Sequence, residues 1–317
     1  MLYIKQYNNT TIIKNDIEEV VIDELVSPLD NLPPTVRKII IKESINIYKR
    51  QNKIPYNCEL IIKNIIIDNI NVFNDMKEED YLDITKLNLS DNKITSIPES
   101  ISSLVNLQKL YLSYNKITSI SESIGSLINL QELYLYNNQI TNIPKSIGSL
   151  ISLQILNLCN NQITSIPKSI SLLVNNLQIL LLSGNRITNI PKFIGSLINL
   201  QELYLSYNKI TSIPEFISSI INLQLLCLSC NQITNIPESI RSLYNLQGLY
   251  LGNNQITSIP ESISSLIKLQ ILHLSDNEIT SIPESIRLLI NLQELNLYNN
   301  KITSIPESIK NKPYLLL

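Results

Sequence analysis

Two cysteines separated by two residues are the first candidates for chemistry in this chain. Cys227-Leu228-Ser229-Cys230 has the spacing of a redox dithiol, which needs a thiolate stabilised at a helix start, or of half a zinc site. The surrounding leucines predict a strand and a turn here, and no second cysteine pair completes a zinc cage. We therefore expect Cys227 and Cys230 to be ordinary structural residues.

Chemistry that requires histidine could involve only His273, which is the single histidine of the chain. A catalytic triad or a zinc cage built on histidine needs partners that the spacing around His273 does not offer. The sequence has no glycine-rich phosphate loop, and its acidic residues occur singly rather than as catalytic pairs. We expect no catalytic site, no metal site and no cofactor, and thus no enzyme.

A repeated unit of about 23 residues must position these side chains. From Ile84 onwards the chain reads L-x-x-L-x-L-x-x-N-x-I-T-x-I-P-x-x-I-x-x-L-x-N ten times, with one extra residue in the fourth copy. The L-x-L alternation predicts a short strand, and the proline fits the start of a short outer segment. One unit buries too little apolar surface to fold alone, so we expect the units to stack. The copies begin at Ile84, Leu107, Leu130, Leu153, Leu177, Leu200, Leu223, Leu246, Leu269 and Leu292.

These residues resemble the leucine-rich-repeat family over the last three quarters of the chain. The resemblance implies an α/β fold: a right-handed curved solenoid with parallel strands on the concave face and short helical, 3-10 or extended segments on the convex face. The Ile-Pro-x-x-Ile segment and the unit length resemble the intracellular type. The abundance of isoleucine and asparagine is similar to such proteins in social amoebae and in giant viruses that infect amoebae. The resemblance also implies a non-catalytic scaffold that binds a protein partner.

An asparagine stands at the ninth position of every copy. The chain turns inward there after the strand, and the side-chain amide can pair with backbone groups of its own and the adjacent coil. We expect a structural role for this asparagine ladder, which comprises Asn92, Asn115, Asn138, Asn161, Asn185, Asn208, Asn231, Asn254, Asn277 and Asn300.

Residues 1–83 lack the regular repeat but keep strand-like apolar spacing at Ile17–Ile22, Val36–Ile41 and Ile62–Ile67. We interpret residues 1–83 as degenerate repeats that cap the ten repeats of residues 84–317. An alternative stays open, because Leu32-Pro33-Pro34-Thr35-Val36 resembles the opening of an F-box, which would make the chain a substrate-recognition adaptor of a ubiquitin ligase. At the other end, Leu315-Leu316-Leu317 either fold back over the last repeat or are covered by a partner.

Composition and charge indicate which kinds of partner and which cellular compartment to expect. A net charge of -2 and a pI near 5.6 give no field that attracts nucleic acid or acidic membranes. No apolar run is long enough to span a membrane, the first residues do not read as a signal peptide, and the cysteines do not cluster into the end caps typical of extracellular relatives. We expect a protein partner rather than nucleic acid or membrane, in the cytoplasm (of the host, if the chain is viral).

A strip rich in tyrosine follows the predicted concave face. Positions two, three, five, seven and eight of the unit point to that face. Position two is glutamine in nine copies, which we interpret as a packing ladder, and position five varies most between copies. Exposed tyrosine and aliphatic side chains mark protein interfaces, although copying of the repeat could also spread tyrosine without selection for binding. The predicted partner-binding residues are Tyr111, Tyr114, Tyr134, Tyr136, Ile155, Ile179, Leu181, Tyr204, Tyr207, Leu225, Tyr250 and His273.

A second pattern follows the proline. Position sixteen is glutamate in most copies, but Lys145, Lys168 and Lys192 replace it in three adjacent ones. A solvated outer face explains such a row. A docking site for an acidic segment is the sharper hypothesis.

Overall fold

The computed structural model describes residues 2–7, 17, 19–25, 38–44, 59–62 and 85–317. The chain divides into two compact units, Met1–Leu156 and Asn157–Leu317, and each unit is treated by itself below. In both units short parallel strands alternate along the chain with other segments, and 3-10 helices are the helical elements of the described part. Among those residues, no helix is long and apolar enough to cross a membrane.

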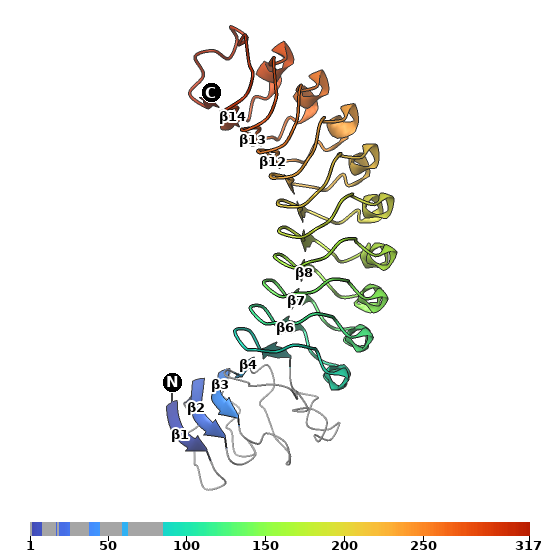
Figure 1. The fold of residues 1–317 in the computed structure, drawn as a ribbon, viewed down its shortest axis with the longest axis vertical. Coiled ribbons are helices and arrows are strands. Elements are labelled where there is room, and N and C mark those ends of the chain that lie inside the picture. Colours follow the sequence, from blue (N-terminus) through green and yellow to red (C-terminus); the bar gives the residue numbers. More distant parts are fainter. Residues whose placement is uncertain (1, 8–16, 18, 26–37, 45–58, 63–84) are drawn as a thin grey trace. The chain divides into compact units, whose positions relative to one another are not determined.

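The first unit begins with four strands that precede the regular repeat and then continues with three regular coils. Its strands pair in parallel and in chain order from β1 to β7 (Figure 1). These elements are β1 (Leu2–Tyr7), β2 (Glu19–Leu25), β3 (Lys38–Ser44), β4 (Glu59–Ile62), β5 (Lys86–Asn88), β6 (Lys109–Tyr111) and β7 (Glu132–Tyr134), with η3 (Glu99–Ser103), η4 (Glu122–Ser126) and η5 (Lys145–Ser149).

The second unit repeats one coil, with its strands on one side and its 3-10 helices on the other (Figure 1). Strand β8 (Ile155–Asn157) contains the boundary between the units. The strands are β9 (Ile179–Leu181), β10 (Glu202–Tyr204), β11 (Leu225–Cys227), β12 (Gly248–Tyr250), β13 (Ile271–His273), β14 (Glu294–Asn296) and β15 (Leu315–Leu316). The helices are η6 (Lys168–Leu173), η7 (Lys192–Ser196), η8 (Glu215–Ser219), η9 (Glu238–Ser242), η10 (Glu261–Ser265) and η11 (Glu284–Leu288). The predicted solenoid of parallel strands backed by short 3-10 segments is confirmed.

Each coil closes around aliphatic side chains. In the coil that begins at Leu200, the strand leucine Leu203 and the outer isoleucine Ile217 are fully buried. The proline before each helix is extended, as at Pro214 with φ -75° and ψ 152°, and its carbonyl accepts a hydrogen bond from the helix backbone. Ser121 replaces this proline in one copy. Its carbonyl accepts the same kind of bond, from the Ile124 N–H, and its hydroxyl accepts a further one from the Ser123 N–H at 3.2 Å. The aliphatic residues that fill this coil are all buried: Leu200, Leu203, Leu205, Ile210, Ile213, Ile217 and Ile220.

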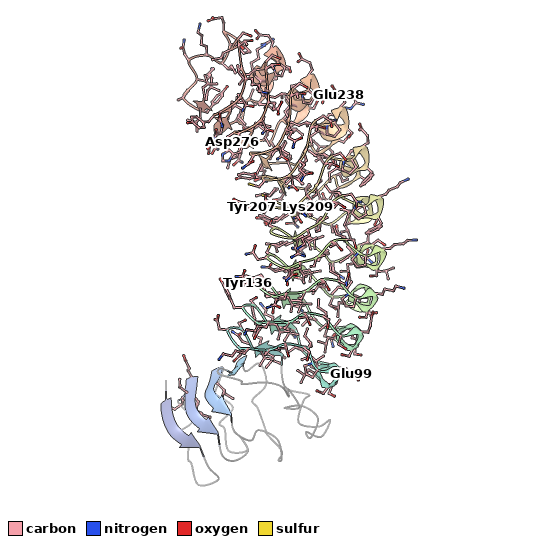
Figure 2. The ribbon with its side chains drawn as sticks, in the orientation of Figure 1. Glu99, Tyr136, Tyr207, Lys209, Glu238 and Asp276 are labelled. Atoms are coloured by element: carbon pink, nitrogen blue, oxygen red, sulfur yellow. The ribbon has the colours of Figure 1, made fainter. Side chains whose placement is uncertain are left out.

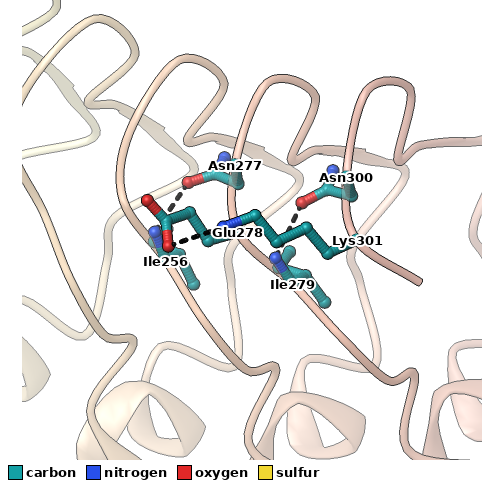
Figure 3. A network of polar contacts seen from close by, with 6 residues as sticks. All are labelled: Ile256, Asn277, Glu278, Ile279, Asn300 and Lys301. Carbon is teal, nitrogen blue, oxygen red and sulfur yellow. Dashed lines mark hydrogen bonds and ion pairs between the residues drawn. The ribbon is translucent and has the colours of Figure 1, made fainter. Parts of the chain in front are cut away.

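The ninth-position asparagine joins neighbouring coils. Asn277 Oδ1 accepts a hydrogen bond from the Ile256 N–H at 2.9 Å, and Asn300 Oδ1 accepts one from the Ile279 N–H at 3.0 Å (Figure 3). Beside them an exposed ion pair joins Lys301 Nζ and Glu278 Oε2 at 3.1 Å. Asn277 Nδ2 also donates to the Leu251 carbonyl of the preceding coil and to the Leu274 carbonyl of its own. Each amide thus bonds backbone groups on two coils, and its oxygen satisfies an isoleucine N–H that would otherwise be buried without this partner.

A second asparagine row lies at the last unit position, where the sequence analysis drew no conclusion. Asn222 Nδ2 donates to the Ile198 carbonyl of the preceding coil at 2.8 Å, and Asn245 Nδ2 donates to the Ile221 carbonyl at 2.9 Å. These side chains are more exposed than the ninth-position ones, so the row links neighbouring coils at the surface of the stack rather than in its core.

The strand register shows how far the repeat extends toward the N-terminus. Val20, Ile39, Leu60 and Leu87 lie opposite one another in β2 to β5. Two predicted strand segments, Ile17–Ile22 and Val36–Ile41, overlap β2 and β3. The third, Ile62–Ile67, shares Ile62 with β4, and its other residues lie outside the described part of the chain.

Two N-terminal predictions fall on residues outside the described part of the chain. The F-box-like segment Leu32–Val36 is one of them, and the division after residue 83 is the other, so both stay predictions. At the C-terminus, Leu315 and Leu316 pair with β14 as strand β15. The chain therefore returns to the last regular coil, with Leu316 46% and Leu317 52% exposed.

Candidate functional site

The strand side of each unit presents the side chains with the most varied chemistry. In a strand such as β10 the central leucine is buried, and the residues on either side of it project to the surface. We call the side chains at unit positions three, five, seven and eight the strand face. Figure 2 shows Tyr136 on this side of the first unit and Glu99 on the helix side.

Four predicted tyrosines come together on the strand face of the first unit. The rings of Tyr111 and Tyr134 stack with centroids 5.0 Å apart and planes 6° from parallel. The rings of Tyr114 and Tyr136 meet edge to face at 4.7 Å. A hydrogen bond with Tyr114, together with burial, raises the pKa of Tyr136 to about 12. We call these two ring pairs the tyrosine cluster; they form an aromatic surface with polar tips.

An ion pair borders the cluster. Lys109 Nζ lies 2.6 Å from Glu132 Oε1, and the Tyr134 hydroxyl donates to Glu132 Oε2 at 3.3 Å. Burial raises the pKa of Tyr134 to about 12, with a smaller contribution from the negative charge of Glu132. Tyr134 therefore stays a neutral hydrogen-bond donor at physiological pH.

The strand face of the second unit is built differently. The Tyr204 hydroxyl donates to Glu202 Oε2 at 3.0 Å, and burial raises the pKa of Tyr204. Tyr250 meets the ring of His273 edge to face at 4.9 Å, and His273 Nε2 lies 2.7 Å from Glu294 Oε1. The polar and aromatic groups thus contact one another across adjacent coils, from Tyr250 to Glu294.

The predicted aliphatic residues are half-buried and divide between the units. Ile155 lies in β8, in the last residues of the first unit. Ile179 and Leu181 project from β9, and Leu225 projects from β11, within the second unit. They form part of the strand face rather than of the interior.

The backbone at position eight is left-handed in every regular coil, as at Tyr207 with φ 55°. Asparagine, aspartate and glycine tolerate this conformation best, and they occupy it in most copies. Tyr114, Tyr207 and Cys230 are the exceptions. Bulky side chains held at such positions are often functional, because the fold does not require them there.

Burial disfavours a reactive thiolate at Cys227 and Cys159. Cys227, Cys230 and Cys159 are all free. Burial, and secondarily the negative charge of Glu202, raises the pKa of the Cys227 thiol to about 12, whereas redox dithiols need a lowered pKa. Within the described residues, no group of three His, Cys, Asp or Glu side chains could hold a metal ion.

A shallow groove of about 270 Å³ runs beside the strand face of the second unit, where the strands begin. Side-chain amides from two rows line it, and the sequence analysis had assigned the glutamine row a packing role only. The lining residues are Asn175, Gln178, Asn199, Gln201, Asn222, Gln224 and Asn245.

The predicted lysine row lies on the helix side. Lys145, Lys168 and Lys192 are exposed and begin η5, η6 and η7. Lys145 belongs to the first unit and the other two to the second.

Family comparison covers most of the regular repeats. The model of a leucine-rich repeat region matches residues 121–217 and 211–312, and the model of a leucine rich repeat matches residues 83–140. A comparison with curated proteins finds no match.

Several solved structures share the architecture. The plant peptide hormone receptor RGFR1 in complex with RGF2 is 27% identical, with 94% of this chain and 52% of that chain covered and a TM-score of 0.67. A TDR receptor is 27% identical, with coverages of 89% and 46% and a TM-score of 0.70. The functional domain of InlJ from Listeria monocytogenes is 27% identical, with coverages of 72% and 47% and a TM-score of 0.63. This chain spans about half the length of these relatives.

Proposed function

Since the chain belongs to the leucine-rich-repeat family, we propose that it is a non-catalytic scaffold that binds a protein partner on its strand face. Proteins of this family are generally binding scaffolds, and their fold is typical of protein–protein interaction. The strand face is also the side that the sequence predicts to be concave.

The observation that carries the proposal is the tyrosine cluster of the first unit. Tyr111 stacks on Tyr134, and Tyr114 packs against Tyr136, so each ring is held by a neighbour before any partner binds. Tyrosine is frequent among the residues that dominate binding energy, and preordered rings lose little conformational entropy on binding. Tyr114 also occupies a left-handed position that asparagine or glycine would fill at lower cost, which supports a role beyond packing.

A relative of similar fold supports a polypeptide ligand. The plant receptor at 27% identity is a peptide hormone receptor described in complex with RGF2. We infer that the partner of this chain is likewise a polypeptide.

Affinity capture with variants tests the proposal. The full chain, a quadruple variant with Tyr111, Tyr114, Tyr134 and Tyr136 replaced by alanine, and the control Tyr244→Ala are immobilised and incubated with cell lysate. Tyr244 is 47% exposed and lies just after η9, on the helix side, so it controls for loss of an exposed ring. We expect the quadruple variant to lose specific proteins that the control retains. Equal recovery by both variants, with unchanged circular dichroism, would refute the proposal.

A further inference from the structure

Charge is segregated in the second unit. All its lysine and arginine residues stand at unit positions ten, sixteen, nineteen, twenty-one or twenty-three, in the turns and on the helix side. Its strand face carries Glu202, Asp276 and Glu294 instead. Figure 2 shows Asp276 on the strand side of this unit and Glu238 on the helix side. The unit as a whole mixes both signs, so the exclusion of cations is specific to this face.

The three carboxylates point outward with partners that are neither lysine nor arginine. Glu202 accepts a hydrogen bond from the Tyr204 hydroxyl, Glu294 Oε1 lies 2.7 Å from the His273 ring, and Asp276 Oδ1 accepts one from Asn299 Nδ2 at 2.8 Å. Within the described part of the chain, no lysine or arginine forms an ion pair with any of them. These contacts orient the carboxylates, and among the described residues no lysine or arginine neutralises them.

Two of the carboxylates flank an apolar stretch within one continuous row of side chains, which continues beyond Glu202 to Ile179. The strand register places Glu202, Leu225, Gly248, Ile271 and Glu294 directly opposite one another in β10 to β14. Four strand spacings separate the ends of this glutamate row, or about 19 Å. Its middle is apolar and presents no charge.

The residues of the middle leave a low surface between the two glutamates. Gly248 has no side chain, and the Tyr250 ring leans over it so closely that an added Cβ would lie 3.0 Å from Cε2. Aromatic rings border the row at two places, Tyr204 next to Glu202 and Tyr250 next to Gly248 at the centre. Aromatic faces attract lysine and arginine side chains as well as apolar ones.

We propose that the glutamate row docks an extended peptide segment that carries a lysine or arginine at each end of a stretch of about six residues. An extended chain advances about 3.3 Å per residue, so six residues match the distance between Glu202 and Glu294. An even separation also puts both cations on the same side of the segment, with apolar side chains between them facing Leu225 and Ile271. The inference rests on the proposed function, because it names the chemistry of the partner on that face.

Peptide binding to the full chain tests the inference. The probe is the fluorescent peptide Lys-Ser-Leu-Ser-Leu-Ser-Lys, whose two lysines lie six residues apart, measured by fluorescence anisotropy. Two matched peptides replace both lysines with glutamate or with serine. The double variant Glu202→Gln/Glu294→Gln keeps the hydrogen-bond acceptors and removes the charges, and Glu215→Gln/Glu238→Gln removes two charges from the helix side as a control.

We expect the lysine peptide to bind at least tenfold more tightly than the glutamate peptide. We also expect its affinity to fall as the salt concentration rises. We expect the strand-face double variant to lose this preference and the helix-side double variant to keep it. Equal affinity of the lysine and serine peptides, or no effect of Glu202→Gln/Glu294→Gln, would overturn the inference, as would absence of lysine-peptide binding at millimolar concentration. If the serine peptide binds equally and Tyr204→Ala/Tyr250→Ala abolishes its binding, the charge preference is wrong while binding on the strand face stands. Serine-peptide binding that persists in Tyr204→Ala/Tyr250→Ala would count against both the charge preference and binding on the strand face.

Discussion

Asn208 holds the coil before it: its Oδ1 accepts a hydrogen bond from the backbone N–H of Ile187 at 2.9 Å. The same side chain donates through Nδ2 to the Leu182 carbonyl of that preceding coil and to the Leu205 carbonyl of its own, at 3.0 Å each. One amide therefore satisfies backbone groups on two coils at once. This arrangement explains why the sequence keeps asparagine at every ninth position.

Replacing Asn208 with alanine should lower the free energy of unfolding by about 1–3 kcal/mol, because it leaves the buried Ile187 N–H without this partner. The Leu182 carbonyl loses one hydrogen bond but keeps the one from Asn185 Nδ2. Chemical denaturation followed by circular dichroism measures the change. Asn222→Ala is the matched control, since that side chain is exposed and donates to the Ile198 carbonyl at the surface. We expect a cost of about 1 kcal/mol or less there. Equal losses for the two variants would contradict the bridging role of Asn208.

Replacing Tyr207 with asparagine should stabilise the chain by about 1 kcal/mol, because asparagine tolerates the left-handed backbone at φ 55° better than tyrosine does. The opposite change, Asn253→Tyr at the equivalent position, should destabilise by a similar amount. Paired denaturation curves measure both. If Tyr207→Asn lowers stability, then the tyrosine packs in a way that outweighs its backbone strain.

The stack between Tyr111 and Tyr134 should contribute a coupling free energy of about 0.5–1.5 kcal/mol to folding. A double-mutant cycle with leucine at each position isolates this coupling from the loss of apolar surface. A coupling within experimental error of zero would mean that the rings are not preordered in the unbound chain. The argument for a preformed tyrosine cluster would then fail.

Cys227 should resist alkylation in the folded chain. Its thiol has a pKa raised to about 12 by burial, so at pH 8 its thiolate is scarcer than that of an exposed cysteine by a factor of about 1000. We expect iodoacetamide to label Cys227 at least about 100-fold more slowly in the native chain than in denaturant, since both pKa and access oppose the reaction. Mass spectrometry of the peptide that contains Cys227 measures the two rates. Similar rates would show that the thiol is neither buried nor protected.

The periodic sequence predicts the coil well and the surface less well. Leucine alternation around Leu203 and the proline at Pro214 are local signals, and ten copies of them determine strand, turn and outer segment. The strand β1 (Leu2–Tyr7) has no repeat to compare with. Near Ile62 several apolar residues follow one another, so the local pattern alone does not determine that Leu60 of β4 lies opposite Leu87.

For the candidate site too, the repeat pattern predicts which residues are neighbours but not how their side chains are oriented. Because strands pair in register, adjacent position-five tyrosines such as Tyr111 and Tyr134 had to be neighbours, and the structure adds the angle at which they meet. The contact between His273 and Glu294 joins positions five and three of adjacent coils, and it depends on side-chain rotamers that no repeat pattern specifies. The left-handed backbone at Tyr114 and Tyr207 is indicated only by the asparagine, aspartate and glycine residues at position eight of the other copies, since tyrosine itself does not favour it.

Site-specific photocrosslinking tests the central claim, binding of a protein partner on the strand face, most directly. A photoreactive phenylalanine analogue replaces Tyr134 on the strand face or Tyr244 on the helix side, and the chain is irradiated in the cells that express it. The account predicts a discrete higher-mass adduct from position 134 and none from position 244. Adducts from position 244 alone, or from neither position when a partner is captured by the intact chain, would contradict it.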